Sequence, residues 1–151
     1  MEATFKIWKT IRDRHLHFLE NHTLKQLNKV PDGFNNNLIW NVGHTIVAQQ
    51  SLIYKSSGLP GYVSEELFNM FKTGTKPTTF ISQKEVIELK QLLVSLLDKT
   101  ITDFYNGKFI TFNERITSSG FRLQSLPDAI EFNNYHEALH LGYMMSIRKF
   151  V

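Results

Sequence analysis

Apolar residues recur every three or four positions along four stretches of the chain, which is the spacing of an amphipathic helix. The stretches cover residues 2–28, 36–55, 82–106, and a last one that runs from residue 125 nearly to the end. The clearest apolar face belongs to the third stretch, with Val86, Leu89, Leu93, Leu97, Ile101 and Phe104. We therefore predict an all-α fold, a four-helix bundle.

Local signals mark where these helices begin and end. Pro31-Asp32-Gly33 follows the first stretch and is a strong turn signal. Ser82 and Glu85 have the spacing of a capping box, and Ser125 followed by Pro127 is typical of a helix N-terminus. Residues 108–124 alternate between apolar and polar side chains in places, so they predict either a short extended hairpin or an ordered loop.

The second and third helices are joined by a long connection, residues 56–81, in which residues 64–71 predict a short helix. A connection of this length can cross the whole bundle and join two parallel neighbours. The second helix is apolar on more than one face, so it lies centrally or is shared with a partner subunit. No repeat or linker divides the chain, and we expect a single domain over residues 1–151.

Composition excludes several function classes. The 151 residues contain no cysteine, which rules out disulfides, thiolate metal ligands and a cysteine nucleophile. The net charge of +3 is dispersed along the chain, so nucleic-acid binding is not expected. No segment approaches the roughly 18 apolar residues of a membrane span, and the start does not resemble a secretory signal. We therefore expect a cytoplasmic protein.

The last helix carries polar residues in the middle of its apolar face. That face consists of Ile130, Asn133, His136, His140, Met144 and Ile147. A buried polar group without a partner costs about 1–3 kcal/mol, so two imidazoles one turn apart need a reason to be there. A metal ion supplies one, because residues four apart lie about 6 Å apart along a helix and both rings can reach a single ion.

His44 is a third candidate ligand. It lies on one face of the second helix with Trp40 and Val47, near mid-helix, as His136 and His140 do on theirs. Three protein nitrogens leave a fourth metal position open, the usual arrangement of a catalytic site. The alternative is that each histidine is an ordinary core residue held by hydrogen bonds. Of the others, His15 could line the pocket and His17 should face solvent.

Residues 136–140 also match H-E-x-x-H, the helix of zinc peptidases, in which the glutamate is the general base. The residues that would extend this motif are absent, since Tyr143 and Ser146 stand where Gly and His are needed. We therefore disfavour a peptidase. Glu137 is kept as a candidate catalytic proton acceptor at the rim of the site, with a surface acid as the alternative.

Smaller roles are predicted for four neighbours of these histidines. Asn133 would orient a ligand or form an interhelical hydrogen bond. Gly43 and Gly142 would allow close helix approach, and Tyr143 would wall the pocket.

Two motifs, Leu38-Ile39-Trp40-Asn41-Val42-Gly43-His44 and Asn133-Asn134-Tyr135-His136-Glu137-Ala138-Leu139-His140-Leu141-Gly142, resemble those of the DinB-like (damage-inducible) metalloprotein family. The resemblance implies an up-down-down-up bundle, commonly a homodimer, with a three-histidine site for Zn²⁺ or Ni²⁺ at His44, His136 and His140. It also implies metal-dependent enzymes that use a low-molecular-weight thiol cosubstrate.

The resulting hypothesis is a metal-dependent thiol transferase or small-molecule hydrolase that acts through the open fourth metal position. The alternative is a non-catalytic, metal-holding bundle linked to stress. Both hypotheses include a bound metal ion, and the enzyme also requires a small-molecule substrate. Neither involves a membrane.

Overall fold

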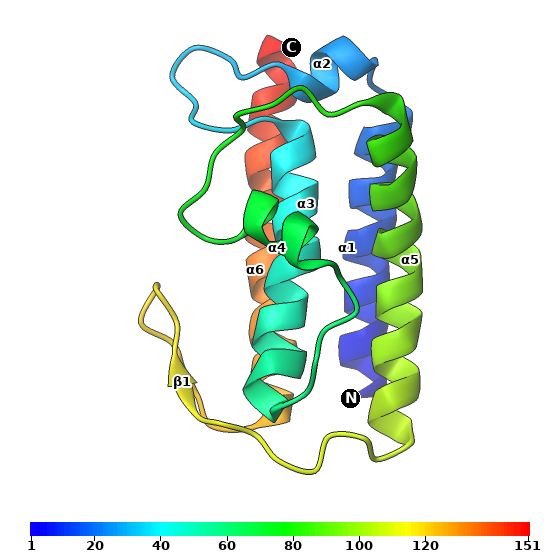
Figure 1. Ribbon diagram of the computed structural model, residues 1–151, viewed down its shortest axis with the longest axis vertical. Coiled ribbons are helices and arrows are strands. Elements are labelled where there is room, and N and C mark those ends of the chain that lie inside the picture. The colour runs from blue at the N-terminus through cyan, green and yellow to red at the C-terminus, as the bar shows by residue number, and fades with distance from the viewer.

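Four long helices lie side by side in the computed structural model, which describes residues 1–151 (Figure 1). They are α1 (Glu2–Glu20), α3 (Leu38–Gln49), α5 (Gln83–Tyr105) and α6 (Leu126–Ile147). Strand structure is limited to one two-stranded ribbon. The predicted all-α bundle is confirmed.

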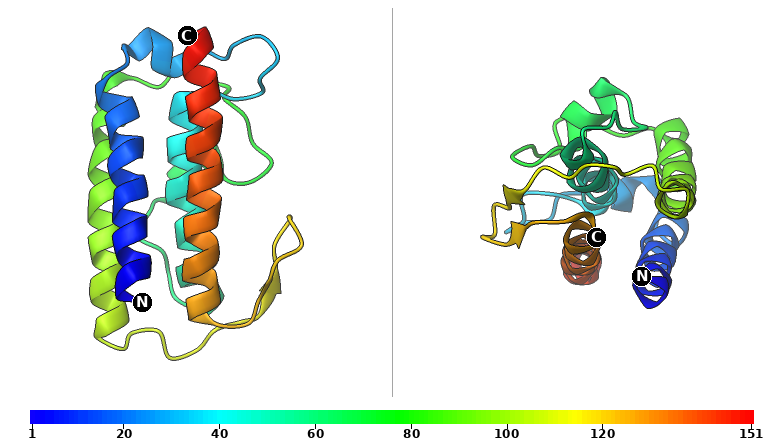
Figure 2. Two further views of the ribbon diagram at one scale, coloured as in Figure 1. Left: turned by 180° about the vertical axis from the view of Figure 1, so that it is seen from behind. Right: turned by 90° about the horizontal axis from the view of Figure 1, so that it is seen from below.

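The helices run in the order up, down, down, up, with α1 and α6 ascending and α3 and α5 descending in Figure 1. Both α1 and α3 pack against α5 and α6. In the end-on view of Figure 2, α1 and α5 form one side of the bundle, and α3 and α6 form the other. The connection between α3 and α5 includes the short helix α4 (Glu65–Phe71), which lies against α3.

The first helix is shorter than predicted. It ends at Glu20, and a separate helix, α2 (Leu24–Asn28), follows after a break. The break arises because Thr23 starts a new capping box: its Oγ1 accepts from Gln26 N at 3.3 Å, and Gln26 Oε1 accepts from Thr23 N at 2.9 Å. The continuous helix predicted over residues 2–28 is therefore wrong.

The second predicted helix also changes character before its end. The regular α-helix α3 ends at Gln49. The chain then continues as a π-helical segment, η1 (Gln50–Tyr54), and a final 3₁₀ turn, η2 (Lys55–Ser57). Such π-helical segments often occur at functional sites.

Helix α3 is enclosed on all sides by the chain itself. Every residue from 38 to 47 is buried, because α3 is in contact with α4 as well as with α5 and α6. Its apolar character on several faces is therefore explained within one copy, and the homodimer stays a prediction.

The remaining elements close the ends of the bundle. Ser82 and Glu85 form the predicted capping box, and Ser125 caps α6 as expected. Strands β1 (Arg115–Ile116) and β2 (Arg122–Leu123) pair antiparallel and form a hairpin beside the α3–α6 side (Figure 2). No helix combines the length and the apolar character that crossing a bilayer requires.

Candidate metal centre

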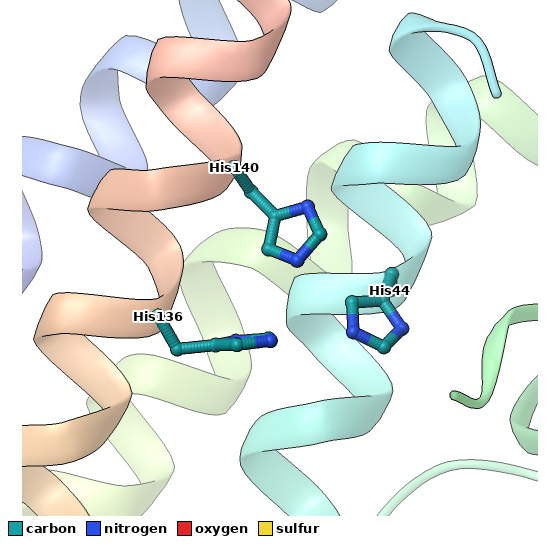
Figure 3. Close-up of side chains that lie close together, drawn as sticks. All are labelled: His44, His136 and His140. Atoms are coloured by element: carbon teal, nitrogen blue, oxygen red, sulfur yellow. The ribbon is translucent and has the colours of Figure 1, made fainter. Parts of the chain in front are cut away.

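The side chains of His44, His136 and His140 converge between α3 and α6 (Figure 3). One nitrogen from each ring lies within 4.8 Å of the other two. The ring of His44 is 5.1 Å from that of His136 and 4.8 Å from that of His140, measured between centroids. The structure thus brings together the three residues that the sequence singled out.

His44 is oriented by the short helix α4. Its Nδ1 lies 2.7 Å from the backbone oxygen of Phe71, and because a carbonyl can only accept, this nitrogen carries the proton. Nε2 is then unprotonated and free to bind a metal. A neutral imidazole whose other nitrogen donates to a carbonyl is the usual form of a metal-ligating histidine.

The close approach of α4 depends on Gly43. A Cβ at this position would lie 2.5 Å from ring carbons of Phe71, which is far inside van der Waals contact. The predicted role of Gly43 in close helix packing is therefore confirmed. For Gly142 it is wrong, because nothing lies within 4 Å of the corresponding Cβ.

His140 is oriented by Asn41, one turn before His44 on α3. Asn41 Nδ2 donates to Asn37 O at 2.7 Å, so its Oδ1 is left to accept from His140 Nδ1 at 2.8 Å. Nε2 of His140 is again left free. Sequence reasoning gave Asn41 no role, although an amide within an otherwise apolar helix start was a usable signal.

The third ring, His136, has a buried Nδ1 without any hydrogen-bond partner. Its ring stacks on Phe132, with centroids 6.1 Å apart. On the other side of the cluster, Trp40 stacks on His44 with 4.8 Å between centroids and 7° between planes. Aromatic walls thus hold two of the three rings.

The three imidazoles are held in the neutral form. Burial lowers the pKa of His44, lowers that of His136 to about 4, and lowers that of His140 to about 2, with further lowering of the last two by neighbouring histidines. A metal ion binds the unprotonated ring, so this environment suits a metal ligand. Tetrahedral coordination places ligand nitrogens roughly 3.4 Å apart, so small ring movements would complete such a site.

One side of the cluster opens into two adjoining pockets. The pocket on the His136 side measures about 180 Å³ and includes Phe132 and Tyr135 in its wall. The pocket on the His44 side measures about 220 Å³. Both share Ala48, Ser51 and Thr73, so the two pockets adjoin, and together we call them the histidine cleft.

Residues 7–144 match the DinB superfamily. The chain belongs to the DinB superfamily. A search of curated proteins finds no match. The two motifs that carried the resemblance supply the three clustered histidines of this DinB chain, His44, His136 and His140.

Glu137 occupies the interior of the DinB bundle, so its predicted place at the rim is wrong. Its carboxylate accepts from Arg12 Nε at 2.7 Å and Nη2 at 2.6 Å, from Trp8 Nε1 at 2.8 Å and from Asn133 Nδ2 at 2.9 Å. Burial acts to raise its pKa, but the charge and hydrogen bonds of Arg12 outweigh burial and the pKa lies below its ordinary value. These contacts do not favour a proton acceptor, nor the general base of a peptidase.

Other predicted neighbours also lie elsewhere. Asn133 bonds within α6 to Glu137 and makes no interhelical bond. His15 is fully buried, with its Nδ1 3.8 Å from Glu137 Oε2, and lines neither pocket of the histidine cleft. Tyr143 lies exposed beside Phe34 instead of walling the cleft. His17 is exposed, as predicted.

Proposed function

We propose that this DinB-superfamily protein binds one Zn²⁺ or Ni²⁺ ion through His44, His136 and His140, and that it is a metal-dependent thiol transferase or small-molecule hydrolase. The observation that carries the proposal is the convergence of three neutral imidazoles, two of which, His44 and His136, line an open cleft. Three protein nitrogens leave a position through which a small molecule can reach the ion.

Different residues of the chain would orient the metal ligands and hold the cosubstrate. Asn41 and the Phe71 carbonyl fix two of the rings with Nε2 free. When bound, the ion would lower the pKa of a thiol or water in its open position, or polarise a carbonyl. Because the chain has no cysteine, any thiol must come from a low-molecular-weight cosubstrate, which the histidine cleft would hold.

The second candidate is a non-catalytic, metal-holding bundle. It would need the three histidines but no cleft beside them, and the size of the cleft favours the enzyme. A homodimer is compatible with either function, and neither requires it.

Metal analysis tests the site. We expect about one zinc or nickel ion per chain in the purified protein, and a loss of 10-fold or more in metal affinity in His44→Ala and His136→Ala. His17→Ala is the matched control, because His17 is exposed and outside the cluster. Full metal content in His44→Ala would refute the three-histidine assignment.

Turnover tests the reaction. The metal-loaded protein should convert members of a panel that pairs small thiols with electrophiles, or hydrolyse members of a small ester and amide panel, and His44→Ala should not. A protein that binds its metal fully and turns over neither panel would support the metal-holding alternative.

A further inference from the structure

The charged side chains that line the histidine cleft are all cationic. Arg115, from strand β1, lines the pocket on the His136 side, and Lys72, just after α4, lines the pocket on the His44 side. Neither wall contains an aspartate or a glutamate. A cleft lined by charges of one sign concentrates ligands of the opposite sign.

Neither cation is neutralised by the protein. Arg115 Nη1 donates to Ser51 Oγ at 3.2 Å and forms no ion pair, because the neighbouring Glu114 is bound by Arg122 instead. Lys72 Nζ donates to the side-chain oxygen of Asn69 at 2.8 Å and has no carboxylate within reach. By contrast, Lys99 and Lys108, outside the cleft, both pair with Asp103.

Hydroxyl groups complete the lining around Arg115. Ser51 and Thr73 come from the bundle side, and Thr117, Ser118 and Ser119 come from the turn of the hairpin. The turn is preformed, since Thr117 Oγ1 accepts from Phe121 N at 3.0 Å and lies 3.1 Å from Ser119 Oγ. Hydroxyls and a guanidinium are the donors that bind carboxylate and phosphate oxygens.

We propose that the histidine cleft takes a small organic anion, whose carboxylate or phosphate group is bound by Arg115 and the hydroxyls around it while its other end reaches the three histidines. The inference deepens the proposed function and rests on it for the histidine end only. The anion end depends on residues of the hairpin, and Arg115 is suited to it because a guanidinium can bind two oxygens of one oxyanion at once.

A matched pair of thiols tests the anion end. Zinc-loaded protein is titrated with 3-mercaptopropionate and with 3-mercaptopropanamide, which carry the same thiol but differ in charge. We expect the acid to bind about 10-fold or more tightly than the amide, because an ion pair with hydrogen bonds is roughly twice as strong as a neutral contact. Arg115→Gln should remove this preference.

Lys99→Gln is the control, because Lys99 is a cation that pairs with Asp103 and does not line the cleft. It should keep the preference for the acid. Equal binding of acid and amide by the wild-type protein, or an unchanged preference in Arg115→Gln, would overturn the proposal.

A metal-free arm separates this inference from the proposed function. In metal-free protein, 3-mercaptopropionate and, separately, inorganic phosphate should shift the backbone amide NMR signals of residues 115–119, and Arg115→Gln should abolish the shifts. The stronger probe identifies the oxyanion. If the anions shift these signals but the protein binds no zinc, the anion site is supported and the metal centre is refuted. If the protein binds zinc but neither anion shifts the signals, the anion site is refuted and the metal centre is supported.

Discussion

Replacing Arg12 by methionine should strongly destabilise the bundle, because it leaves the Glu137 carboxylate charged in the interior without its counter-charge. Arg12 is 2% exposed and Glu137 is 0% exposed, and two hydrogen bonds of 2.6 and 2.7 Å join them. Breaking a buried ion pair of this kind costs about 3–5 kcal/mol. That is a large part of the roughly 5–15 kcal/mol by which a domain is stable.

The assay is urea unfolding of the metal-free protein, carried through a double-mutant cycle. Glu137→Gln removes the negative charge but keeps an oxygen that can accept from Trp8 and Asn133. The double variant should therefore be more stable than the Arg12→Met single variant, with a coupling energy of at least about 2 kcal/mol. Arg14→Met, on the exposed side of the same helix, should change the free energy of unfolding by less than about 0.5 kcal/mol.

Two outcomes would refute this reasoning. One is a cost below about 1 kcal/mol for Arg12→Met, which would mean that water or a shifted pKa relieves the charge. The other is additivity of the two substitutions within about 0.5 kcal/mol, which would show that the ion pair contributes nothing specific.

Three further predictions concern single positions. Burial lowers the pKa of His15 to about 4, so between pH 6.5 and 4 the unfolded state binds a proton that the folded state does not. The free energy of unfolding of the metal-free protein should decrease as the pH is lowered through this window; His15 contributes on the order of 3 kcal/mol of the decrease, and His136 and His140 add their own shares. His15→Leu should make the decrease smaller by about that 3 kcal/mol in a pH series of urea melts. Gly43→Ala should lower the melting temperature and weaken zinc binding, because its Cβ would collide with the ring of Phe71, the last residue of α4, whereas Gly142→Ala should be neutral or stabilising by about 0.5–1 kcal/mol. Asn41→Leu should weaken zinc binding about 10- to 100-fold by releasing the ring of His140, measured by competition with a chelator; unchanged affinity would contradict the orienting role.

Features encoded locally could be predicted from the sequence. Apolar spacing and capping residues located the four main helices, and the mid-helix positions of His44, His136 and His140 were enough to place them at one depth. The Thr23 capping box that divides the first helix is also local, but the apolar pattern continues across it and conceals the break.

The surroundings of Glu137 could not be predicted in the same way. An offset of 100° from His136 indicates the rim only if α6 has one inward direction. In the structure α6 packs against both α1 and α3, so it has two, with His136 turned toward α3 and Glu137 toward α1. Nothing near Arg12 identifies a partner 125 residues away, and the contribution of Arg115 to the cleft depends in the same way on how the hairpin folds back.

The carbonyl that orients His44 belongs to Phe71, which lies outside the four long helices. The long helices therefore form the bundle, whereas the orientation of the His44 ring depends on a residue of the connection between α3 and α5. Exchanges at the exposed positions of residues 58–81 would alter how firmly that imidazole is held, whereas Phe71 and Ile81 belong to the core that supports the bundle. For protein engineering and for divergence among related sequences, this crossover is the region in which affinity at the centre can be changed without redesigning the bundle.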